Sequence, residues 1–236
     1  METPRFYSAK VSQIIELAPT VKHFVLDYPP DADTHFTPGQ FIMLHLQKDG
    51  LPHRKSYSIA SSPSLKNKIE LSVKLVEEGY VTNYLFKLKE GAILHTSLPY
   101  GLFMVQEPWQ DNLIFVATGT GIAPIRSMIK NLYEKKCDRT IWLIFGNRYE
   151  SEILYLDEWR ALEKKYKNFR FIPTISRSKE WPGEKAYVQE VVKKTFAGQN
   201  EGLDFYGCGL LRMCRDLKAT LIEMNIPKER VHFEAF

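Results

Sequence analysis

The residues best suited to chemistry follow an apolar run, in the segment Leu113–Arg126 (LIFVATGTGIAPIR). The run Leu113–Ala117 has no polar alternation, which predicts a strand buried on both faces of a parallel sheet. Gly119 and Gly121 allow a tight turn and a close approach of a ligand to the backbone, and a helix begins near Pro124. Free N–H groups at a helix start attract anions, so the segment predicts a phosphate-binding site. A purely structural turn between a strand and a helix would need the same two glycines.

A second segment, Arg54–Ser62 (RKSYSIASS), contains residue types that suit a flavin nucleotide. Arg54 and Lys55 can pair with a pyrophosphate. Tyr57 offers a flat face to an isoalloxazine ring, and the Ser58 hydroxyl can form a hydrogen bond near the reacting nitrogen. An ordinary strand, with the tyrosine packed and both cations solvated, explains the same residues.

A third segment, Gly79–Leu85 (GYVTNYL), runs from a strand through a glycine to Thr82, which we expect to cap the following helix. The backbone donors of that helix start are a second place where phosphate can bind. Ordinary capping explains Thr82 equally well. Capping alone does not explain why one chain contains two helix starts suited to anions, after Gly79 and after Gly121, together with the Tyr57 segment.

Composition narrows the class of protein. The 236 residues are 44% hydrophobic, which is enough for one sizeable core or two smaller ones, and we favour two domains. The segment Met1–Arg5 lacks a leader pattern and no apolar run reaches the length of a membrane span, so we expect a cytoplasmic protein without a membrane span. A net charge of +4, without a basic run, gives no support for nucleic-acid binding.

The cysteines, histidines and charges restrict the kinds of site. Cys137, Cys208 and Cys214 form no CxxC pair, which excludes an in-chain four-cysteine iron–sulfur site and suits a reducing compartment. The six histidines have no metal-ligand spacing, so we expect no metal. Residues 1–110 carry 11 Lys and Arg and 11 Asp and Glu. The whole positive excess therefore lies in the second half, where we expect the anionic ligand.

Two patterns of secondary structure divide the chain. The first half has short β-rich runs separated by Pro, Gly and Asp, which predicts an antiparallel barrel. The second half alternates buried-type strands with helices, which predicts a doubly wound, parallel α/β sheet. We expect domains at residues 1–105 and 106–236. The predicted strands include Val21–Leu26, Phe41–Leu46, Ser56–Ala60, Ile69–Val76, Leu113–Ala117, Thr140–Phe145, Phe169–Pro173 and Leu203–Tyr206, and the predicted helices include Ile125–Lys136, Leu156–Lys167 and Arg212–Met224.

The order of these motifs resembles that of the ferredoxin–NADP reductase family, two-domain flavoproteins, over essentially the whole chain. In that family an RxYS motif binds FAD, a glycine before a Ser or Thr helix start holds its pyrophosphate, and GTGIAP holds the pyrophosphate of the nicotinamide nucleotide. The matching segments are Lys55–Ser58, Gly79–Thr82 and Gly119–Pro124. One departure is that Lys55 occupies the position of the motif arginine. Lysine lacks the bidentate fork, so FAD is held less tightly unless Arg54 reaches the same phosphate.

The second half is similar to the plant-type and plastidic-type members of the family. Tyr206–Met213 (YGCGLLRM) matches the family's CGLxxM segment, which implies that Cys208 helps to place the nicotinamide ring. A cysteine that ends a buried strand more often only packs. The end of the chain, His232–Phe236, is similar to the family's acidic-x-aromatic end, which implies that Phe236 covers the flavin until nicotinamide displaces it and that Glu234 lies near the flavin N5 edge. An ordinary terminal strand is the alternative.

The choice of nicotinamide cofactor rests on Thr174–Arg177 and Gly183–Gln189, which are similar to the family segments around the 2′-phosphate of NADP. One guanidinium, one ammonium and two hydroxyls converging on a dianion favour NADP over NAD, whose ribose usually meets an acidic residue. A pair of cations on a solvated loop is the alternative reading. The resemblance implies NADP contacts from Thr118, Gly119, Thr120, Gly121, Pro124, Ser176, Arg177, Lys185, Tyr187, Cys208 and Gly209.

The resemblance also implies the reaction and its residues. The reaction is hydride transfer between NADP(H) and FAD, coupled to single-electron exchange with a ferredoxin or flavodoxin. The implied catalytic residues are Ser58, Cys208, Glu234 and Phe236, and the implied FAD contacts are Arg54, Lys55, Tyr57, Ser58, Val73, Lys74, Gly79, Val81, Thr82 and Phe236. An NAD(P)H:flavin reductase and an electron-transfer subunit of a multicomponent oxygenase or reductase remain alternatives. We expect a monomer.

Overall fold

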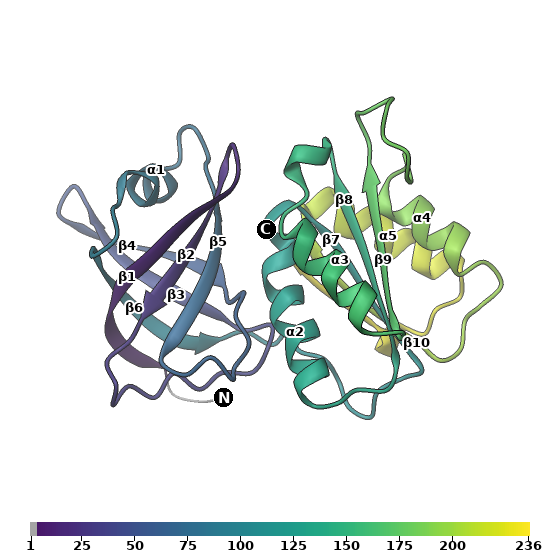
Figure 1. The fold of residues 1–236 in the computed structure, drawn as a ribbon, viewed down its shortest axis with the longest axis horizontal. Coiled ribbons are helices and arrows are strands. Elements are labelled where there is room, and N and C mark those ends of the chain that lie inside the picture. Colours follow the sequence, from purple (N-terminus) through teal and green to yellow (C-terminus); the bar gives the residue numbers. More distant parts are fainter. Residues whose placement is uncertain (1–3) are drawn as a thin grey trace. The chain divides into compact units, whose positions relative to one another are not determined.

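The computed structural model describes residues 4–236; residues 1–3, on which part of the leader expectation rests, lie outside the described residues. Contacts divide the chain into two compact units. The first contains residues 4–104 and Arg126–Glu134, and the second contains Val105–Ile125 and Lys135–Phe236. The predicted fold class is confirmed, because an antiparallel six-stranded sheet is followed by a parallel five-stranded sheet (Figure 1).

The first unit is an antiparallel barrel with strand order β4-β3-β6-β1-β2-β5. A bridge between Ile59 and Leu71 joins the chain after β4 to β5 and closes the sheet. One short helix, α1, follows β5. The elements are β1 (Arg5–Ala18), β2 (Val21–Asp27), β3 (Phe41–Lys48), β4 (Leu51–Ser58), β5 (Lys68–Lys74), α1 (Tyr80–Lys87) and β6 (Ile93–Tyr100).

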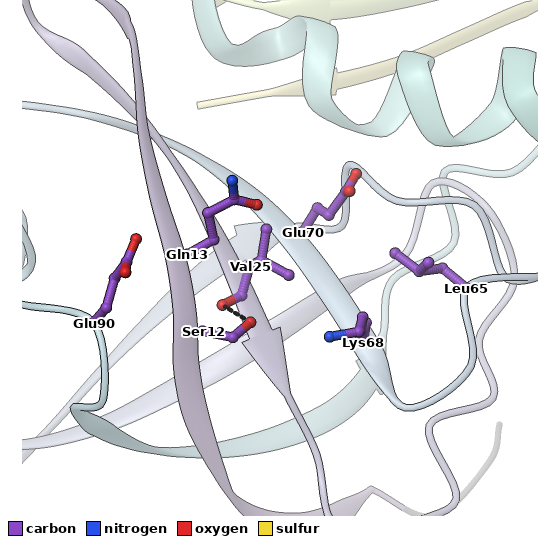
Figure 2. A pocket seen from close by; sticks show the side chains of 7 residues that line it. All are labelled: Ser12, Gln13, Val25, Leu65, Lys68, Glu70 and Glu90. Carbon is purple, nitrogen blue, oxygen red and sulfur yellow. Dashed lines mark hydrogen bonds between the residues drawn. The ribbon is translucent and has the colours of Figure 1, made fainter.

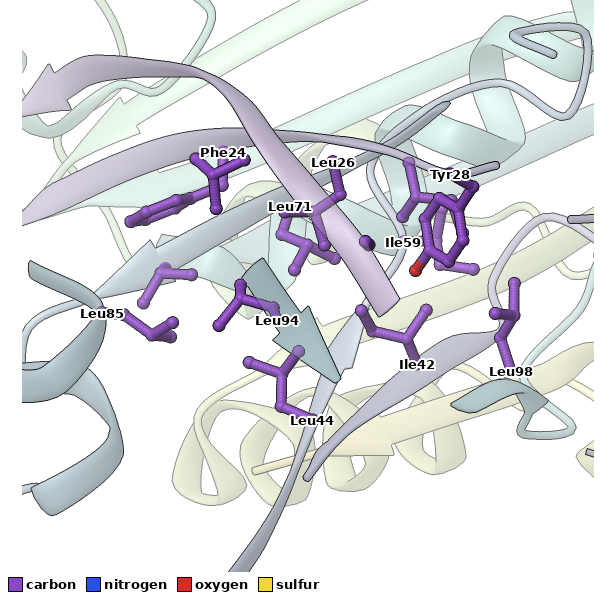
Figure 3. Close-up of a cluster of buried hydrophobic side chains, with 14 of the residues drawn as sticks. Phe24, Leu26, Tyr28, Ile42, Leu44, Ile59, Leu71, Leu85, Leu94 and Leu98 are labelled. Carbon is purple, nitrogen blue, oxygen red and sulfur yellow. The ribbon is translucent and has the colours of Figure 1, made fainter. Parts of the chain in front are cut away.

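Alternating apolar residues of these strands fill the barrel (Figure 3). Phe24, Ile42, Leu44 and Leu94 are at most 2% exposed, and burying each such side chain stabilises the fold by about 1.5–3 kcal/mol. The one polar group drawn in this core, the Tyr28 hydroxyl, is satisfied by the Thr96 hydroxyl at 3.1 Å. The core therefore holds the strands that present the flavin-type residues on the barrel surface.

The predicted strand Ser56–Ala60 has the wrong bounds. Strand β4 begins at Leu51 and ends at Ser58, and it pairs along its whole length with β3, from Lys48 opposite Leu51 to Phe41 opposite Ser58. Most of its side chains are exposed, because it is an edge strand of the sheet order. Such a strand lacks the apolar alternation that sequence patterns detect.

The second unit is a parallel sheet with strand order β11-β10-β7-β8-β9. Helices α4 and α5 pack on one face, over Ile114, Val116 and Ile144. On the other face Trp159 of α3 packs beside Phe169 and Phe171 of β9. The elements are β7 (Asn112–Thr118), the start of α2 (Ile122–Glu134), whose residues from Arg126 on belong to the first unit, β8 (Thr140–Asn147), α3 (Leu156–Lys165), β9 (Phe169–Ile175), α4 (Val188–Thr195), β10 (Leu203–Gly209), α5 (Leu211–Glu223) and β11 (Val231–Ala235), with single 3₁₀ turns at Gly119–Gly121, Glu150–Glu152 and Lys228–Arg230.

Strand β7 confirms the pattern read from its sequence. Residues 113–117 are all 0% exposed, as expected of a central strand covered on both faces. It pairs in parallel with β10 on one side and with β8 on the other. Across residues 4–236, no helix is long and apolar enough to cross a membrane.

A buried ion pair lies within the first unit. Arg126 donates to the Glu70 carboxylate at 2.5 Å and to the carbonyl oxygen of Ala60 at 2.8 Å, and it is 6% exposed. Burial alone would raise the pKa of Glu70. The charge and hydrogen bond of Arg126, with a smaller contribution from His23, outweigh burial and hold this pKa below its ordinary value.

We predict that Arg126→Leu lowers the free energy of unfolding by about 3 kcal/mol at neutral pH, because it leaves a buried carboxylate without its partner. The double variant Arg126→Leu/Glu70→Leu should recover much of this loss, which urea titrations can measure. Because the folded pKa of Glu70 is lowered, its contribution is present above about pH 5 and lost as the pH falls through the folded pKa. Equal losses in the single and double variants would contradict the assigned pairing.

Candidate functional site

The turn after β7 has the backbone geometry of an anion site. Gly119 has φ +54° with open space around it, so its backbone conformation favours glycine. Gly121 is needed for a different reason: a Cβ at this position would lie 2.2 Å from the carbonyl oxygen of Cys208. Helix α2 then begins at Ile122. Pro124 lies in its first turn, where a backbone N–H would have no partner within the helix.

The end of β10 lies beside this turn. Cys208 is the register partner of Ala117, and the backbone N–H of Leu210 donates to the Thr118 hydroxyl at 3.4 Å. The Cys208 side chain is fully buried. Burial, with smaller contributions from Glu234 and Cys214, raises the pKa of its thiol well above the ordinary value. The thiol therefore stays uncharged, and the backbone of Cys208 and Gly209 lies directly against Gly121 of the turn.

The predicted 2′-phosphate residues gather at the carboxyl end of β9. The backbone N–H of Ile175 donates to the carbonyl oxygen of Glu184 at 2.9 Å, which brings Lys185 beside Ser176. Arg177 and Lys185 are both exposed, and the Lys185 ammonium donates to the carbonyl oxygen of Lys179 at 2.6 Å. Tyr187 caps α4 through a capping box and is 62% exposed.

Arg148, which the sequence analysis did not identify, is a third cation at this edge. Arg148, Arg177 and Lys185 are together called the cation cluster. The backbone N–H of Ser176 donates to Asn147, and that of Arg177 to Arg148, each at 3.0 Å. These bonds extend the pairing of β8 and β9 past their ends and put the Arg148 and Arg177 backbones side by side. Arg148 is exposed, with its guanidinium 3.9 Å from the Glu152 carboxylate. The sequence does contain a signal for Arg148: a cation directly after a buried parallel strand lies at the ligand-binding edge of the sheet.

The C-terminal strand reaches the same edge. Strand β11 pairs in parallel with β10 and places Glu234 opposite Cys208 and Ala235 opposite Gly209. The backbone N–H of Phe236 donates to the carbonyl oxygen of Gly209 at 3.2 Å, and its side chain is 59% exposed. The structure thus brings Glu234 and Phe236 to the side of β10 opposite the turn after β7, with Glu234 beside Cys208.

On the first unit, strand β4 presents the flavin-type residues. Opposed residues share a face, so Tyr57 and Lys55, which lie opposite Ile42 and Leu44, are on one face. Arg54 is on the other face, opposite His45. Burial, with smaller contributions from Arg54 and His95, lowers the pKa of His45. Lys55 and Arg54 therefore point to different sides of the strand.

Tyr57 supplies the test of whether a flavin fits. Its hydroxyl is buried and has no hydrogen-bond partner among residues 4–236. Burial raises its pKa, so it stays protonated. A buried hydroxyl normally has a partner, and a polar ligand lying against this strand would supply one. The ring packs against the barrel core on one side, and the surrounding strand is open to solvent.

The helix start at Gly79 differs from the prediction for Thr82. Gly79 is the N-cap of α1, and Thr82 lies inside the first turn, so its assignment as the cap is wrong. The Thr82 hydroxyl donates to the carbonyl oxygen of Gly79 and accepts from the backbone N–H of Val76, both at 3.1 Å. It braces the loop before the helix. Strand β5 with Val73 and Lys74 leads into this loop, and Val81 is buried beneath the helix start.

The helix start also lies close to β4. The Tyr80 hydroxyl donates to the carbonyl oxygen of Gln47 at 2.6 Å, and its ring meets His53 of β4 edge to face, with centroids 5.6 Å apart. The Gly79 loop and the Lys55 strand are therefore neighbours on the barrel.

A separate open depression of about 520 Å³ on the barrel does not coincide with any predicted site residue (Figure 2). Its polar groups are largely committed: Lys68 pairs with Asp27 at 2.6 Å, and the Ser12 hydroxyl donates to Asp27 at 2.7 Å. Among the described residues no group of three or more His, Cys, Asp or Glu is arranged to hold a metal ion. The lining residues are Ser12, Gln13, Val25, Leu65, Lys68, Glu70 and Glu90.

Comparisons with known proteins match both units. Residues 8–105 match the model of the oxidoreductase FAD-binding domain, and residues 115–219 match that of the oxidoreductase NAD-binding domain. The chain is 32% identical to ferredoxin–NADP reductase B of Sorangium cellulosum, covering 98% of this chain and 97% of that protein. It is 33% identical to the reductase component of phenol 2-monooxygenase from Pseudomonas sp. (strain CF600), covering 98% of this chain but only 65% of that protein. A ferredoxin NADP⁺ reductase from Neisseria gonorrhoeae, solved with FAD and NADP, shares the fold with a TM-score of 0.87, 22% identity and 98% coverage of both chains.

We predict that Gly121→Ala disrupts the turn after β7, because the new Cβ would overlap the Cys208 carbonyl group. The variant should lose about 1–3 kcal/mol of stability in the second unit and most of its retention on immobilised 2′,5′-ADP. Gly198→Ala is the control, since it adds a Cβ in the same unit at a glycine with φ +75° and nothing within 4 Å of the new Cβ, and therefore tests backbone strain without the overlap. Equal retention of both variants would argue against the turn as the nucleotide site.

Proposed function

Because the chain belongs to the ferredoxin–NADP reductase family of FAD- and NAD(P)-binding oxidoreductases, we propose that it transfers hydride between NADP(H) and FAD and exchanges single electrons with a ferredoxin or flavodoxin. The observation that carries the proposal is the anion-ready turn at Gly119–Gly121, packed on Cys208 and flanked by a cluster of cations. In this proposal residues 1–105 hold FAD and residues 106–236 hold NADP(H). The motif likeness of the second half to plant-type and plastidic-type members remains part of the proposal.

The barrel residues bind and orient the flavin in this proposal. When bound, FAD couples a two-electron hydride step to one-electron steps, which no side chain can do. Lys55, on the face of Tyr57, attracts the pyrophosphate, and the Gly79 loop, with Thr82, Val81, Val73 and Lys74 around it, offers backbone donors. The orphaned Tyr57 hydroxyl and its ring support a flat, polar ligand on β4. Arg54 lies on the opposite face and contributes its charge only at a distance.

The residues of the second unit bind and orient the nicotinamide nucleotide. Thr118, Thr120 and the two glycines before Pro124 receive its pyrophosphate. The cation cluster of Arg148, Arg177 and Lys185, with Ser176 and Tyr187, selects a 2′-phosphate, because guanidinium and ammonium groups stabilise a dianion. NADP(H) is therefore the proposed substrate. Ser58 and Glu234 are proposed to hydrogen-bond near the reacting centre, while Cys208 and Phe236 limit where the nicotinamide ring can lie.

A second candidate, favoured by the 33% identity to a phenol 2-monooxygenase reductase component, is the reductase of a multicomponent oxygenase. In that case the electron acceptor is an oxygenase component or its carrier and not a free-standing ferredoxin or flavodoxin. A third candidate is an NAD(P)H:flavin reductase, which would use flavin as a diffusing substrate. Monomeric state and cytoplasmic location belong to the first proposal.

The visible spectrum of the purified protein, followed under anaerobic conditions, separates these functions. A bound flavin that is bleached faster by NADPH than by NADH supports the first proposal. A colourless protein that nevertheless reduces added flavin points to the flavin reductase. Stoichiometric copurification of an oxygenase component, with little diaphorase activity without it, favours the oxygenase reductase. A coloured protein indifferent to both nucleotides would rule out the hydride step.

We predict that Arg177→Ala and Arg148→Ala each raise the KM for NADPH by about tenfold, because each removes a charge-assisted contact with the 2′-phosphate. The KM for NADH, which lacks that phosphate, should change little. Arg160→Ala is the control, since Arg160 is an exposed cation on α3 outside the cluster. An equal effect of either cluster variant on NADPH and NADH would place that arginine outside the 2′-phosphate site.

We predict that Phe236→Ser lowers the dissociation constant of the nicotinamide nucleotide and also lowers kcat, because the ring no longer competes with nicotinamide. The exposed Ile222→Ser in α5 is the matched control for loss of surface apolar area. Equilibrium titration of the oxidised flavoprotein and steady-state kinetics measure the two effects. Unchanged binding and turnover would remove Phe236 from the site.

A further inference from the structure

A fully buried carboxylate lies near the start of β10. Asp204 is 0% exposed, and its Oδ2 accepts a hydrogen bond from the Tyr206 hydroxyl at 3.2 Å. Its Oδ1 lies 3.4 Å from Nε2 of His232, an ion-pair distance when the histidine is protonated, and neither of these two atoms makes a hydrogen bond within residues 4–236. Arg230 approaches Oδ2 at 3.7 Å. A buried carboxylate is costly unless it is paired, and two of the three groups around Asp204 come from the C-terminal end of the chain.

The His232 ring is also held by stacking. It lies on Tyr206 with centroids 4.7 Å apart and an interplanar angle of 14°. Tyr206 in turn stacks on Phe115 at 5.3 Å, so a column of three rings crosses β7, β10 and β11. Tyr206 and His232 are register partners. The histidine therefore joins β11 to the sheet through its ring face and its Nε2 atom together.

The next residue fixes β11 on the opposite face. Phe233 packs so closely on Gly207 that a Cβ on this glycine would lie 2.2 Å from the ring. A slip of one residue that brought His232 opposite Gly207 would put Phe233 opposite Cys208 and exchange the faces on which the two side chains lie. Both faces of β11 thus oppose a change of register.

The consequence falls on the last residues of the chain. Glu234 is two residues after His232, and Phe236 is four. Beyond the strand, Phe236 is tied by one backbone hydrogen bond to Gly209, and its ring is 59% exposed. The ring therefore depends for its placement on the strand before it.

We propose that Asp204 and His232 are a positioning pair that holds β11 in register and so places Glu234 and Phe236 for nicotinamide exchange. The inference rests on the proposed function, because it takes Phe236 to be the group that nicotinamide displaces. Neither Asp204 nor His232 is assigned contact with substrate or cofactor. Both act through the strand.

A double-mutant cycle on the full-length flavoprotein tests the pair. His232→Phe keeps a stacking ring but removes Nε2, and it is made in the wild-type and Phe236→Ser backgrounds. In the wild-type background we expect a fall of about three- to tenfold in the KM for NADPH, together with a lower kcat. In the Phe236→Ser background the same substitution should change KM by less than about twofold, because the group it positions is already gone. His232→Gln, which retains an N–H donor, should restore part of the wild-type KM.

Controls separate positioning from general loss of stability. Phe196→Leu removes a fully buried ring on the face covered by α4 and α5, away from the stacked column. It should lower the melting temperature as much as His232→Phe does but leave the KM for NADPH unchanged. If His232→Phe does not fold, Asp204→Asn, which keeps the shape and removes the charge, takes its place in the cycle.

The possible outcomes separate the positioning role of Asp204 and His232 from the role of Phe236 in the site. A KM shift of the same size in both backgrounds, or a loss of stability with no KM shift, would overturn the positioning role while leaving Phe236 in the site. No KM or affinity change in Phe236→Ser itself would overturn both that part of the proposed function and the positioning pair. A shift confined to the wild-type background supports both.

Discussion

The close packing of the Gly121 backbone on the carbonyl group of Cys208 is the constraint on which the nucleotide edge of the second unit depends. Strands β7 and β10 are parallel neighbours with Ala117 opposite Cys208, so the turn after β7 has to pass over the end of β10. Only a residue without a side chain allows that passage. The same contact aligns the Thr118 hydroxyl with the backbone of Leu210. The anion-ready turn and the end of β10 are therefore one packed feature.

The sequence predicts local features of this edge well and long-range ones poorly. The buried strand β7, its glycine turn and the following helix are encoded within Leu113–Arg126, and the structure contains all three. Arg148 was missed because its place beside Arg177 depends on the pairing of β8 with β9, which no local pattern specifies. Thr82 shows an error of the opposite kind. Its type suits a cap, but Gly79 is one turn earlier and the hydroxyl instead bonds the loop before the helix.

The register of β4 determines which of the two adjacent cations, Arg54 or Lys55, lies on the same face as Tyr57. Side chains alternate along a strand, so two adjacent cations cannot both share the face of Tyr57. Lys55 does and Arg54 does not. The alternation follows from the sequence once the strand is known to include both residues. The predicted strand began at Ser56, and for that reason the sequence analysis left Arg54 as a substitute for the motif arginine.

Burying Asp204 costs free energy, but the pair that it forms with His232 specifies the register of β11 against β10. Apolar packing alone does not specify this register. Side chains of a strand repeat every two residues, so a slip of two residues would keep apolar groups on their own faces. Such a slip of β11 toward the carboxyl end of β10 would put Arg230 opposite Tyr206 and His232 opposite Cys208, which displaces the chain end by about 7 Å. The contact between Phe233 and Gly207 opposes a slip of one residue. It opposes a slip of two residues less, because another β11 residue from the same face would then lie opposite Gly207. A polar pair is specific to its two residues: after a slip of one or two residues in this direction, Asp204 would no longer lie beside His232 and would stay buried without it.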